Sequence, residues 1–325
     1  MRVFSGIQPT GQIHIGNYLG AIKQWIELQE KNECVFCIVD LHALTVPHDP
    51  KTLQESILEK VVVYLAAGID PEKSIIFIQS QIKEHTELTW LLNTITSIGD
   101  LTRMTQYKEK SKKFKKNLNA GLLNYPILMA SDILLYQTDI VPVGEDQKQH
   151  VELTRTIARK FNQRFGEVFK IPEARIPKTG AKIMNLQQPA KKMSKTDSPE
   201  TYIGLFDEPE EIKAKIMKAV TDTGKTIKYN EKLKPGISNL LTIYSLFSGK
   251  TIKELEEKFK RKGYADFKKS LSDLLINSLE SFRRKKKELL TREVYVKEIL
   301  NQGVKRAQVI ASSTMQEVKK KMGLI

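Results

Sequence analysis

The sequence predicts an α/β fold, in which a doubly wound, Rossmann-like parallel sheet is followed by an all-helical C-terminal domain. In the first part of the 325-residue chain, short continuous apolar runs alternate with helical patterns, as they do in parallel sheets covered by helices. After about Tyr202 the pattern is amphipathic and helical, and no strand-like run stands out. We therefore expect two domains, residues 1–205 and residues 206–325, with a boundary between Leu205 and Pro209.

The elements follow from hydrophobic periodicity, taken in chain order. Four short apolar runs are predicted strands: Arg2–Ile7, Cys34–Val39, Ile75–Ile78 and Ile140–Val143. Helices are predicted over Asn17–Lys31, Thr52–Ala67, Glu84–Ile98, Ile127–Tyr136 and Glu145–Phe165. Gly68 is the expected stop of the second of these helices. Further helices are predicted over Glu208–Val220, Ile237–Phe247, Ile252–Lys260 and most of the chain from Asp266 onward.

Composition argues for a cytoplasmic protein that does not enter a membrane. No apolar run approaches the roughly 18 residues that a membrane-spanning helix needs. The N-terminus, Met1 to Ile7, enters structured-looking sequence without the charged and then apolar stretch of a signal peptide.

Charge favours a polyanionic partner. The formal net charge is +15, and the segment from Lys250 to Ile325 holds 20 Lys and Arg against 10 Asp and Glu. A second stretch, from Arg103 to Lys116, has seven basic residues and one acidic residue. Such clusters are typical of nucleic-acid-binding surfaces, although basic solvent-facing helices are an equally ordinary explanation on charge alone.

The two cysteines, Cys34 and Cys37, are interpreted as core thiols. Their spacing also occurs in redox and zinc sites, but residues three apart on a strand point to opposite faces. A zinc site would need two further ligands, and the chain holds no second cysteine pair. We predict no protein-ligated metal.

Two segments have residues that can bind a nucleoside triphosphate. The first predicted strand runs into His14-Ile15-Gly16-Asn17 at the start of a helix, where Gly16 permits close approach to the backbone. His14 and Asn17 can donate hydrogen bonds to a phosphate at the positive end of that helix. A strand-to-helix turn without a ligand is the alternative, and neither the dinucleotide nor the P-loop pattern is present.

The second segment is a loop, Lys191-Lys192-Met193-Ser194-Lys195-Thr196. Two lysines three residues apart, with a hydroxyl between them, can neutralise a leaving pyrophosphate. A solvated surface loop is the alternative if the segment is considered alone.

Together the two segments resemble the paired signatures of class I aminoacyl-tRNA synthetases, His-Ile-Gly-His and Lys-Met-Ser-Lys-Ser. Asn17 and Thr196 are the departures, and Asn at the end of the first signature is usual in the tryptophanyl branch of the family. The resemblance to bacterial members of that branch extends over essentially the whole chain. It includes Phe4–Pro9, Cys37–Ala43, Arg103–Gln106, Tyr125–Tyr136, Val141–His150 and Lys234–Leu240.

The resemblance implies residues that bind ATP. Gln8, Lys110, Lys192 and Lys195 would be catalytic, because the lysines would stabilise the transferring phosphoryl group and the pyrophosphate. Gly144, Glu145 and Asp146 would take the ribose, with simple helix capping as the alternative. The full implied set for ATP is Gln8, Pro9, Thr10, His14, Gly16, Asn17, Gly144, Glu145, Asp146, Ile183, Lys192, Met193, Ser194, Lys195 and Thr196.

The resemblance also implies a tryptophan pocket. Asp132 would accept the indole N–H, or would instead cap or pair locally. The pocket would further contain Phe4, His42, Met129, Tyr125 and Gln147, the last two holding the amino group. His42 is equally compatible with a core histidine, and we interpret His48 and His85 as structural or surface residues.

The implied chemistry is activation of tryptophan by ATP, followed by transfer to the 3′-terminal ribose of tRNA(Trp). The amino-acid carboxylate is itself the nucleophile, so catalysis needs positioning and charge stabilisation, with Mg²⁺ on the phosphates. The family implies a homodimer, and an anticodon-binding role for residues 206–325 with Arg283 to Lys287 near the RNA backbone. The alternatives are a tyrosine-specific synthetase of the same architecture, a nucleotidyltransferase with a smaller substrate and a non-catalytic RNA-binding paralogue.

Overall fold

The computed structural model describes residues 1–9, 11–113, 119–176, 183–194 and 197–325, without the side chains of Lys110, Lys112 and Lys113. The chain forms two compact units. The sheet unit contains Met1–Thr10, Trp25–Lys178 and Arg292–Ile325, and the helical unit contains Gly11–Gln24 and Thr179–Thr291. Among the described residues, no helix has the length and apolar character needed to cross a membrane.

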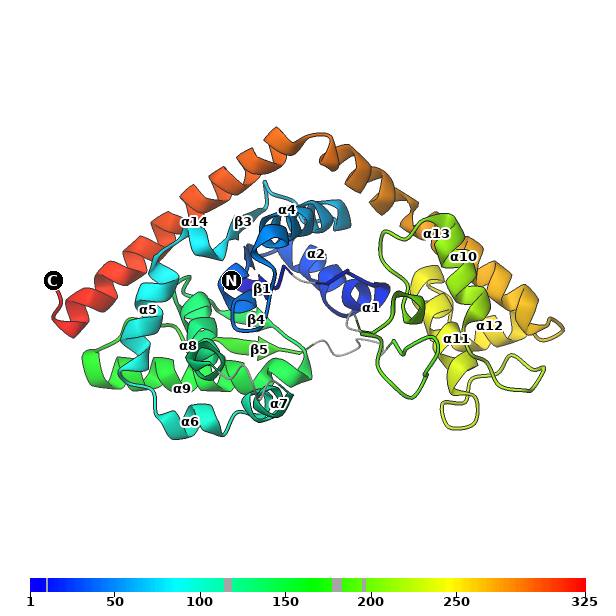
Figure 1. The fold of residues 1–325 in the computed structure, drawn as a ribbon, viewed down its shortest axis with the longest axis horizontal. Helices are drawn as coiled ribbons and strands as arrows, with labels where there is room; N and C mark the ends of the chain where they lie inside the picture. The colour runs from blue at the N-terminus through cyan, green and yellow to red at the C-terminus, as the bar shows by residue number, and fades with distance from the viewer. Residues whose placement is uncertain (10, 114–118, 177–182, 195–196) are drawn as a thin grey trace. The chain divides into compact units, whose positions relative to one another are not determined.

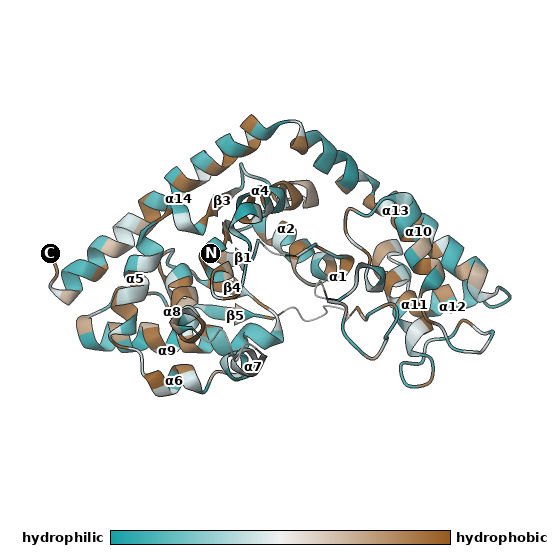
Figure 2. Ribbon diagram, viewed as in Figure 1, coloured by the Kyte–Doolittle hydropathy of each residue, from teal (hydrophilic) through white to brown (hydrophobic). Residues whose placement is uncertain are grey.

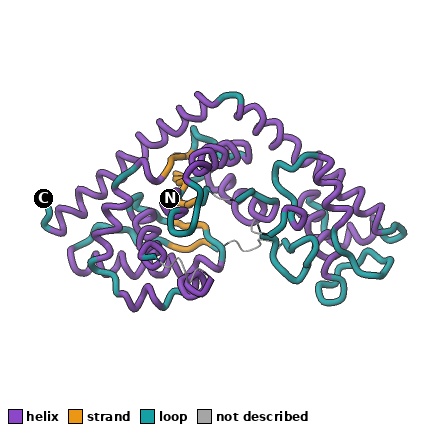
Figure 3. Tube along the Cα trace, in the orientation of Figure 1, coloured by secondary structure: helices purple, strands orange, loops and turns teal. Residues whose placement is uncertain are grey.

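The sheet is parallel throughout and has five strands in the order β3-β2-β1-β4-β5. Their bounds are β1 Arg2–Ile7, β2 Glu33–Ile38, β3 Ser74–Ile78, β4 Ile140–Pro142 and β5 Glu173–Arg175. The predicted doubly wound sheet is therefore confirmed, and Figure 3 shows the strands gathered together. The strand β5 was not predicted, because its three residues are polar or only partly buried and carry no apolar run.

Helices of the sheet unit connect and cover these strands (Figure 1). They are α3 Asp40–Ala43, α4 Pro50–Ala67, η2 Gln79–Gln81, α5 Glu84–Asn93, α6 Ile98–Thr102, α7 Thr105–Lys113, α8 Ala120–Leu134, η4 Glu145–Gln147, α9 Lys148–Phe165 and α14 Glu293–Met322. Gly68 ends α4 with φ 113°, as predicted, because a left-handed conformation there favours glycine.

Several predicted helix bounds are wrong for local reasons. The segment expected to be one helix over Asn17–Lys31 is divided into α1 Ile15–Asn17, the π-helical η1 Tyr18–Ile22 and α2 Lys23–Gln29. The helix predicted to start at Ile127 begins at Ala120, since α8 continues through Pro126. Proline usually breaks a helix interior, which explains the prediction of a later start.

The cysteines lie in the core, as predicted. Cys34 and Cys37 are free and buried on β2. Burial raises the pKa of the Cys34 thiol to about 11 and that of Cys37 well above its ordinary value. Both thiols are therefore protonated at neutral pH and are poor nucleophiles.

The predicted division at residue 205 does not match the compact units. Helix α14 belongs to the sheet unit, where it packs on β3 and α5, as its orange-to-red ribbon shows in Figure 1. Its Arg306 Nη1 donates to the carbonyl oxygens of Pro71 and Ser74, each at 3.2 Å, beside the edge strand β3. Apolar and polar residues alternate along α14 (Figure 2), so periodicity alone does not reveal which unit the helix covers.

The helical unit is built from α1, η1, η5 Pro199–Thr201, α10 Pro209–Lys218, α11 Pro235–Ser248, α12 Ile252–Lys258 and α13 Tyr264–Leu290. Helix α10 packs on α13, and α13 also contacts α11. Arg283 of α13 is buried, with its Nη2 donating to the carbonyl of Ile276 at 2.7 Å and Nη1 to that of Asp207 at 3.4 Å. The prediction that Arg283 lies near an RNA backbone is therefore wrong, because its guanidinium group is used inside the fold.

Candidate functional site

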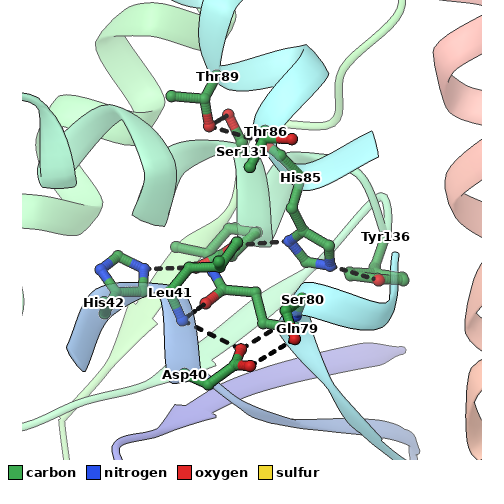
Figure 4. A network of polar contacts seen from close by, with 12 residues as sticks. Asp40, Leu41, His42, Gln79, Ser80, His85, Thr86, Thr89, Ser131 and Tyr136 are labelled. Carbon is green, nitrogen blue, oxygen red and sulfur yellow. Dashed lines mark hydrogen bonds and ion pairs between the residues drawn. The ribbon is translucent and has the colours of Figure 1, made fainter. Parts of the chain in front are cut away.

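Asp132 is the centre of a buried polar network in the sheet unit. It lies in α8 and is 1% exposed. Its Oδ1 accepts from Gln79 Nε2 at 2.6 Å and lies 2.6 Å from His85 Nδ1, while its Oδ2 lies 2.8 Å from His42 Nε2. Figure 4 shows His42, Gln79 and His85 within one network of polar contacts. Asp132 thus pairs with neighbouring side chains, as the alternative interpretation proposed. Two partners face Oδ1, and one partner faces Oδ2.

The network keeps the Asp132 carboxylate ionised. Burial alone would raise its pKa, but the hydrogen bonds from His42 and His85 outweigh that effect and lower the pKa to about 2. An ionised carboxylate accepts hydrogen bonds and cannot donate them. The carboxylate can therefore accept a hydrogen bond from an N–H donor of a ligand.

Topology explains how these residues meet. His42 lies in α3 directly beyond β2, and Gln79 is the first residue after β3. Since β2 and β3 are parallel neighbours, their carboxyl ends lie at the same edge of the sheet. Ligands of doubly wound sheets bind at this edge.

The other predicted pocket residues are partly grouped with Asp132. Phe4 on β1 is 2% exposed and stacks on Tyr136, with ring centroids 5.6 Å apart. The His42 and Tyr125 rings have centroids 6.3 Å apart, and Met129 packs at the edge of the hydrophobic core. His42 thus combines both interpretations, being a buried histidine that contacts the proposed indole acceptor.

The two residues predicted to hold the amino group have different surroundings. The Tyr125 hydroxyl lies 2.9 Å from His150 Nε2 and donates to Gln106 Oε1 at 3.4 Å. Burial raises the pKa of Tyr125 to about 12, so its hydroxyl remains protonated at neutral pH. Gln147 donates to the Asp146 carboxylate at 2.9 Å.

The predicted ribose-binding residues follow β4. Gly144 precedes η4, and Glu145 and Asp146 form its first turn; all three are exposed. A Cβ atom at Gly144 would lie 2.6 Å from Asp146 Oδ1, so glycine leaves room for that carboxylate. The residues begin a short 3-10 turn that precedes α9, and their side chains are accessible to a ligand.

Both signature segments belong to the helical unit. Ile15 N–H donates to the carbonyl of Ile203 at 2.9 Å, and Leu205 N–H donates to that of Ile13 at 2.8 Å, so the first signature pairs with residues 203–205. His14 Nδ1 accepts from Asn17 N–H, and Asn17 Oδ1 accepts from His14 N–H, each at 3.2 Å. His14 Nδ1 is therefore a capping acceptor here, which leaves Nε2 as the ring nitrogen that can donate to a phosphate.

Gly16 is the point of close packing in the first signature. A Cβ atom there would lie 2.9 Å from His14 Nδ1 and 3.6 Å from the Cβ of Ile183. Ile183 is buried, and its carbonyl accepts from Met193 N–H at 3.0 Å. The first and second signatures are thus linked through Ile183 within one unit.

In the second signature the backbone is held by contacts within the fold, and the side chain of Lys192 is exposed. Met193 is 3% exposed, and Lys192 pairs with Met184 in an isolated antiparallel bridge. Asn239 of α11 holds Met184 on both sides, accepting from its N–H and donating to its carbonyl, each at 2.9 Å. Lys192 itself is exposed and Ser194 is half-buried.

Three of the predicted residues lie outside the described part of the chain: Thr10, Lys195 and Thr196. The Lys110 side chain is also outside it, although the backbone of Lys110 lies in α7. Gln8 is exposed and Pro9 is buried, directly after β1.

Sequence reasoning missed three residues of the Asp132 network: Gln79, Tyr136 and, in part, His85, which was interpreted as structural or surface. His85 is structural in being fully buried, but it contacts the central carboxylate. Gln79 could have been found, because it follows the predicted strand ending at Ile78 and strand ends carry ligand-binding side chains. His85 and Tyr136 have no comparable signal.

Comparisons with known proteins agree with this geometry. Residues 1–280 match the family model of the tRNA synthetases class I (W and Y). The chain is 53% identical to the tryptophan–tRNA ligase of Caldanaerobacter subterraneus subsp. tengcongensis over 325 residues, covering 100% of this chain and 98% of that protein. It is 54% identical to the tryptophan–tRNA ligase of Helicobacter pylori over 325 residues, covering 100% and 99% of the two chains.

Solved structures give the same assignment. Tryptophanyl-tRNA synthetase from Campylobacter jejuni, complexed with ADP and tryptophan, is 40% identical with a TM-score of 0.88, covering 99% of this chain and 100% of that one. The enzyme from Mycoplasma pneumoniae is 37% identical with a TM-score of 0.87, covering 99% and 97%. The match spans the sheet, both signatures and the C-terminal helices, and the chain belongs to the class I tRNA synthetases of the tryptophan and tyrosine group.

Proposed function

We propose that this chain is a tryptophan–tRNA ligase, which activates tryptophan with ATP and transfers it to tRNA(Trp). The observation that carries the proposal is the buried, ionised Asp132 at the carboxyl edge of the sheet. Indole has one polar atom, a donor-only N–H, and Asp132 is an acceptor-only group. The full-length relatives, which are tryptophan–tRNA ligases, support the same substrate.

The proposed selection of tryptophan over tyrosine depends on α8. Tyr125, Met129 and Asp132 are four and three residues apart, so they lie on one side of the helix. Met129 is apolar and adaptable, which suits the broad indole ring better than a phenol that needs a hydrogen-bond partner. Phe4, with His42, would enclose the same ring.

The activation step needs charge stabilisation more than proton transfer. The tryptophan carboxylate attacks the α-phosphorus of ATP, and pyrophosphate leaves as that bond breaks. Lys192 and Lys195, with Lys110, are proposed to stabilise the charge on the departing pyrophosphate. Gln8, Pro9, Thr10, His14, Gly16 and Asn17 are proposed nucleotide contacts of the first signature, and Gly144, Glu145 and Asp146 are proposed to bind the ribose.

Mg²⁺ bound to the ATP phosphates is part of the proposal. The described residues offer no group of three or more His, Cys, Asp or Glu side chains that could hold a metal ion. Mg²⁺ in nucleotide sites depends largely on substrate phosphates and water, so the residues present fit an ion that arrives with ATP. Such an ion would neutralise phosphate charge and add to the effect of the lysines.

We further propose that the chain acts as a cytoplasmic homodimer and that residues 206–325 include the anticodon-binding surface. Trp90 on α5 is 70% exposed and Ile98 at the start of α6 is 72% exposed. A subunit interface over these neighbouring helices would cover both side chains. Sedimentation at micromolar concentration tests the dimer, and a monomeric native protein would contradict it.

The test of the function is ATP–pyrophosphate exchange with tryptophan, tyrosine and phenylalanine offered separately. Tryptophan should be strongly preferred, and phenylalanine, which lacks a donor, should be rejected. Asp132→Ala should reduce the preference for tryptophan by roughly 2–3 kcal/mol, the worth of a hydrogen bond to a charged group. A native enzyme that favoured tyrosine would overturn the substrate while leaving the family unchanged.

A further inference from the structure

His85 and Tyr136 form a second layer behind the Asp132 carboxylate. His85 Nδ1 faces Asp132 Oδ1 at 2.6 Å, and its other ring nitrogen, Nε2, lies 2.8 Å from the Tyr136 hydroxyl. His85 and Tyr136 are both 0% exposed. Figure 4 shows the imidazole of His85 bridging toward Tyr136 on the side away from His42.

The direction of each hydrogen bond follows from the charge of Asp132. Because the carboxylate only accepts, the His85 nitrogen that faces it must carry the proton. In neutral imidazole the other nitrogen is then an acceptor, so the Tyr136 hydroxyl donates to it. Burial raises the pKa of Tyr136 well above its ordinary value, which keeps the O–H proton in place.

The Asp132 carboxylate sets the His85 tautomer, and the Tyr136 hydroxyl holds the other end of the imidazole ring. Without that hydroxyl, the buried His85 Nε2 would lose its hydrogen-bond partner, and the ring could tilt out of line with Asp132. Gln79 reaches the same oxygen, and its own amide is oriented because its Oε1 accepts from Leu41 N–H at 3.1 Å. Oδ1 therefore receives two oriented donors, while Oδ2 is approached by His42 at 2.8 Å.

We propose that Tyr136 and His85 are positioning residues for amino-acid specificity: Tyr136 fixes the orientation of the His85 ring, and His85 holds Asp132 so that Oδ2 accepts the N–H of an indole side chain. This inference rests on the proposed function, since it concerns how the tryptophan acceptor is aimed. Neither residue touches the reacting atoms, and both act through Asp132.

Tyr136 also supports the pocket wall, so the test must keep its ring. Its ring stacks on that of Phe4, with an angle of 9° between the two ring planes. The ring centroids of Tyr136 and Phe77 are 5.5 Å apart. Tyr136→Phe retains this packing and removes only the hydroxyl. The matched control is Tyr64→Phe, which removes another buried hydroxyl, on α4, outside the Asp132 network.

The first experiment compares L-tryptophan with 3-benzothienyl-L-alanine, in which sulfur replaces the indole N–H. The KM for tryptophan and the inhibition constant of the analogue are measured by pyrophosphate exchange. Tyr136→Phe should raise the KM for tryptophan about tenfold, the worth of one well-aimed hydrogen bond, with the KM for ATP and the inhibition constant unchanged. Equal weakening of both ligands would indicate a loosened pocket and overturn the proposal.

The second experiment tests whether Tyr136 acts through His85. His85→Asn keeps an N–H donor near the position of Nδ1 but has no second ring nitrogen for Tyr136 to hold. It should retain most of the tryptophan preference, whereas His85→Leu should lose it. Adding Tyr136→Phe to His85→Asn should then have no further effect, and an undiminished tenfold loss in that background would overturn the assignment.

The outcomes separate this inference from the proposed function. If the native protein shows no tryptophan-dependent exchange, the function fails before any variant is compared. If native exchange is normal and Tyr136→Phe behaves like Tyr64→Phe in both KM values, the function stands and the positioning role is lost. Thermal unfolding of each variant identifies any that is not folded. If Tyr136→Phe alone does not fold, the comparison of His85→Asn with and without Tyr136→Phe still tests the positioning role.

Discussion

Gly303 of α14 faces the carbonyl group of Ile76 on β3 so closely that a side chain cannot fit between them. A Cβ atom at position 303 would lie 1.8 Å from the Ile76 oxygen and 2.7 Å from its carbonyl carbon. The neighbours are backbone atoms, so they cannot move aside as a flexible side chain would. This approach lets the C-terminal helix lie against the edge strand of the sheet.

Gly303→Ala should therefore destabilise the sheet unit, although alanine is the better helix former. We expect a loss of about 1–3 kcal/mol, as for other overpacked contacts, measured by chemical denaturation. Gly99→Ala in α6 is the control, because its nearest Cβ neighbours would be side-chain atoms at 3.4 Å. Equal stability of Gly303→Ala and Gly99→Ala would mean that α14 does not depend on this contact.

Because of Asp132, the free energy of unfolding should fall as the pH is lowered in the acidic range. Its pKa is lower in the folded protein, about 2, than its ordinary value of 3.8. The carboxylate therefore stabilises the fold above about pH 4, and this contribution disappears as the pH falls toward 2, with a total of about 2 kcal/mol. The measurement is the free energy of unfolding from pH 7 to pH 2 for the native protein and Asp132→Asn.

The difference between these two proteins should be constant near neutral pH and shrink below pH 4. Asp273→Asn, at an exposed position on α13, is the control and should change the curve much less. A native-minus-Asp132→Asn difference that stayed level down to pH 2 would contradict an ionised Asp132 in the network.

Lys192 should matter for activation but not for folding. Its side chain is exposed, while the backbone around it is fixed by the bridge to Met184. Lys192→Ala should lower the exchange rate about a hundredfold, as loss of one charged transition-state partner does elsewhere, with unfolding unchanged. Lys191→Ala, which removes the neighbouring exposed lysine, should stay close to native. A similar loss in both variants would point to a general effect of loop charge.

Lys195→Ala is expected to lose at least as much activation rate as Lys192→Ala, on the order of 3 kcal/mol. Lys195 is the second lysine of the same signature. Pyrophosphate exchange near the native rate in Lys195→Ala would remove that lysine from the mechanism.

Binding of tRNA should depend steeply on salt through exposed lysines and arginines of α13. Arg284 and Lys285 are exposed, whereas Arg283 is buried. Arg284→Ala and Lys285→Ala should each reduce the slope of log Kd against log salt by about one, because each phosphate contact releases counterions. Arg283→Ala should instead reduce stability, and tRNA affinity independent of salt would exclude this surface.

Sequence patterns were enough to predict the parallel sheet, the place of most helices, the two signatures and the side of α8 that carries Tyr125, Met129 and Asp132. These features are encoded locally, because period, turn residues and motif spacing act over a few residues. The core location of Cys34 and Cys37 followed from the apolar run that contains them. The family resemblance added the roles that local patterns leave open.

Tertiary structure alone decided which unit α14 belongs to and which side chains surround Asp132. Gln79 and His85 are 53 and 47 residues from Asp132 in the chain, and they reach it only because β2, β3, α5 and α8 converge at one edge of the sheet. The burial of Arg283 likewise depends on Asp207, 76 residues away. Periodicity shows that a helix has an apolar face but not which surface covers it, since that choice depends on packing between distant segments.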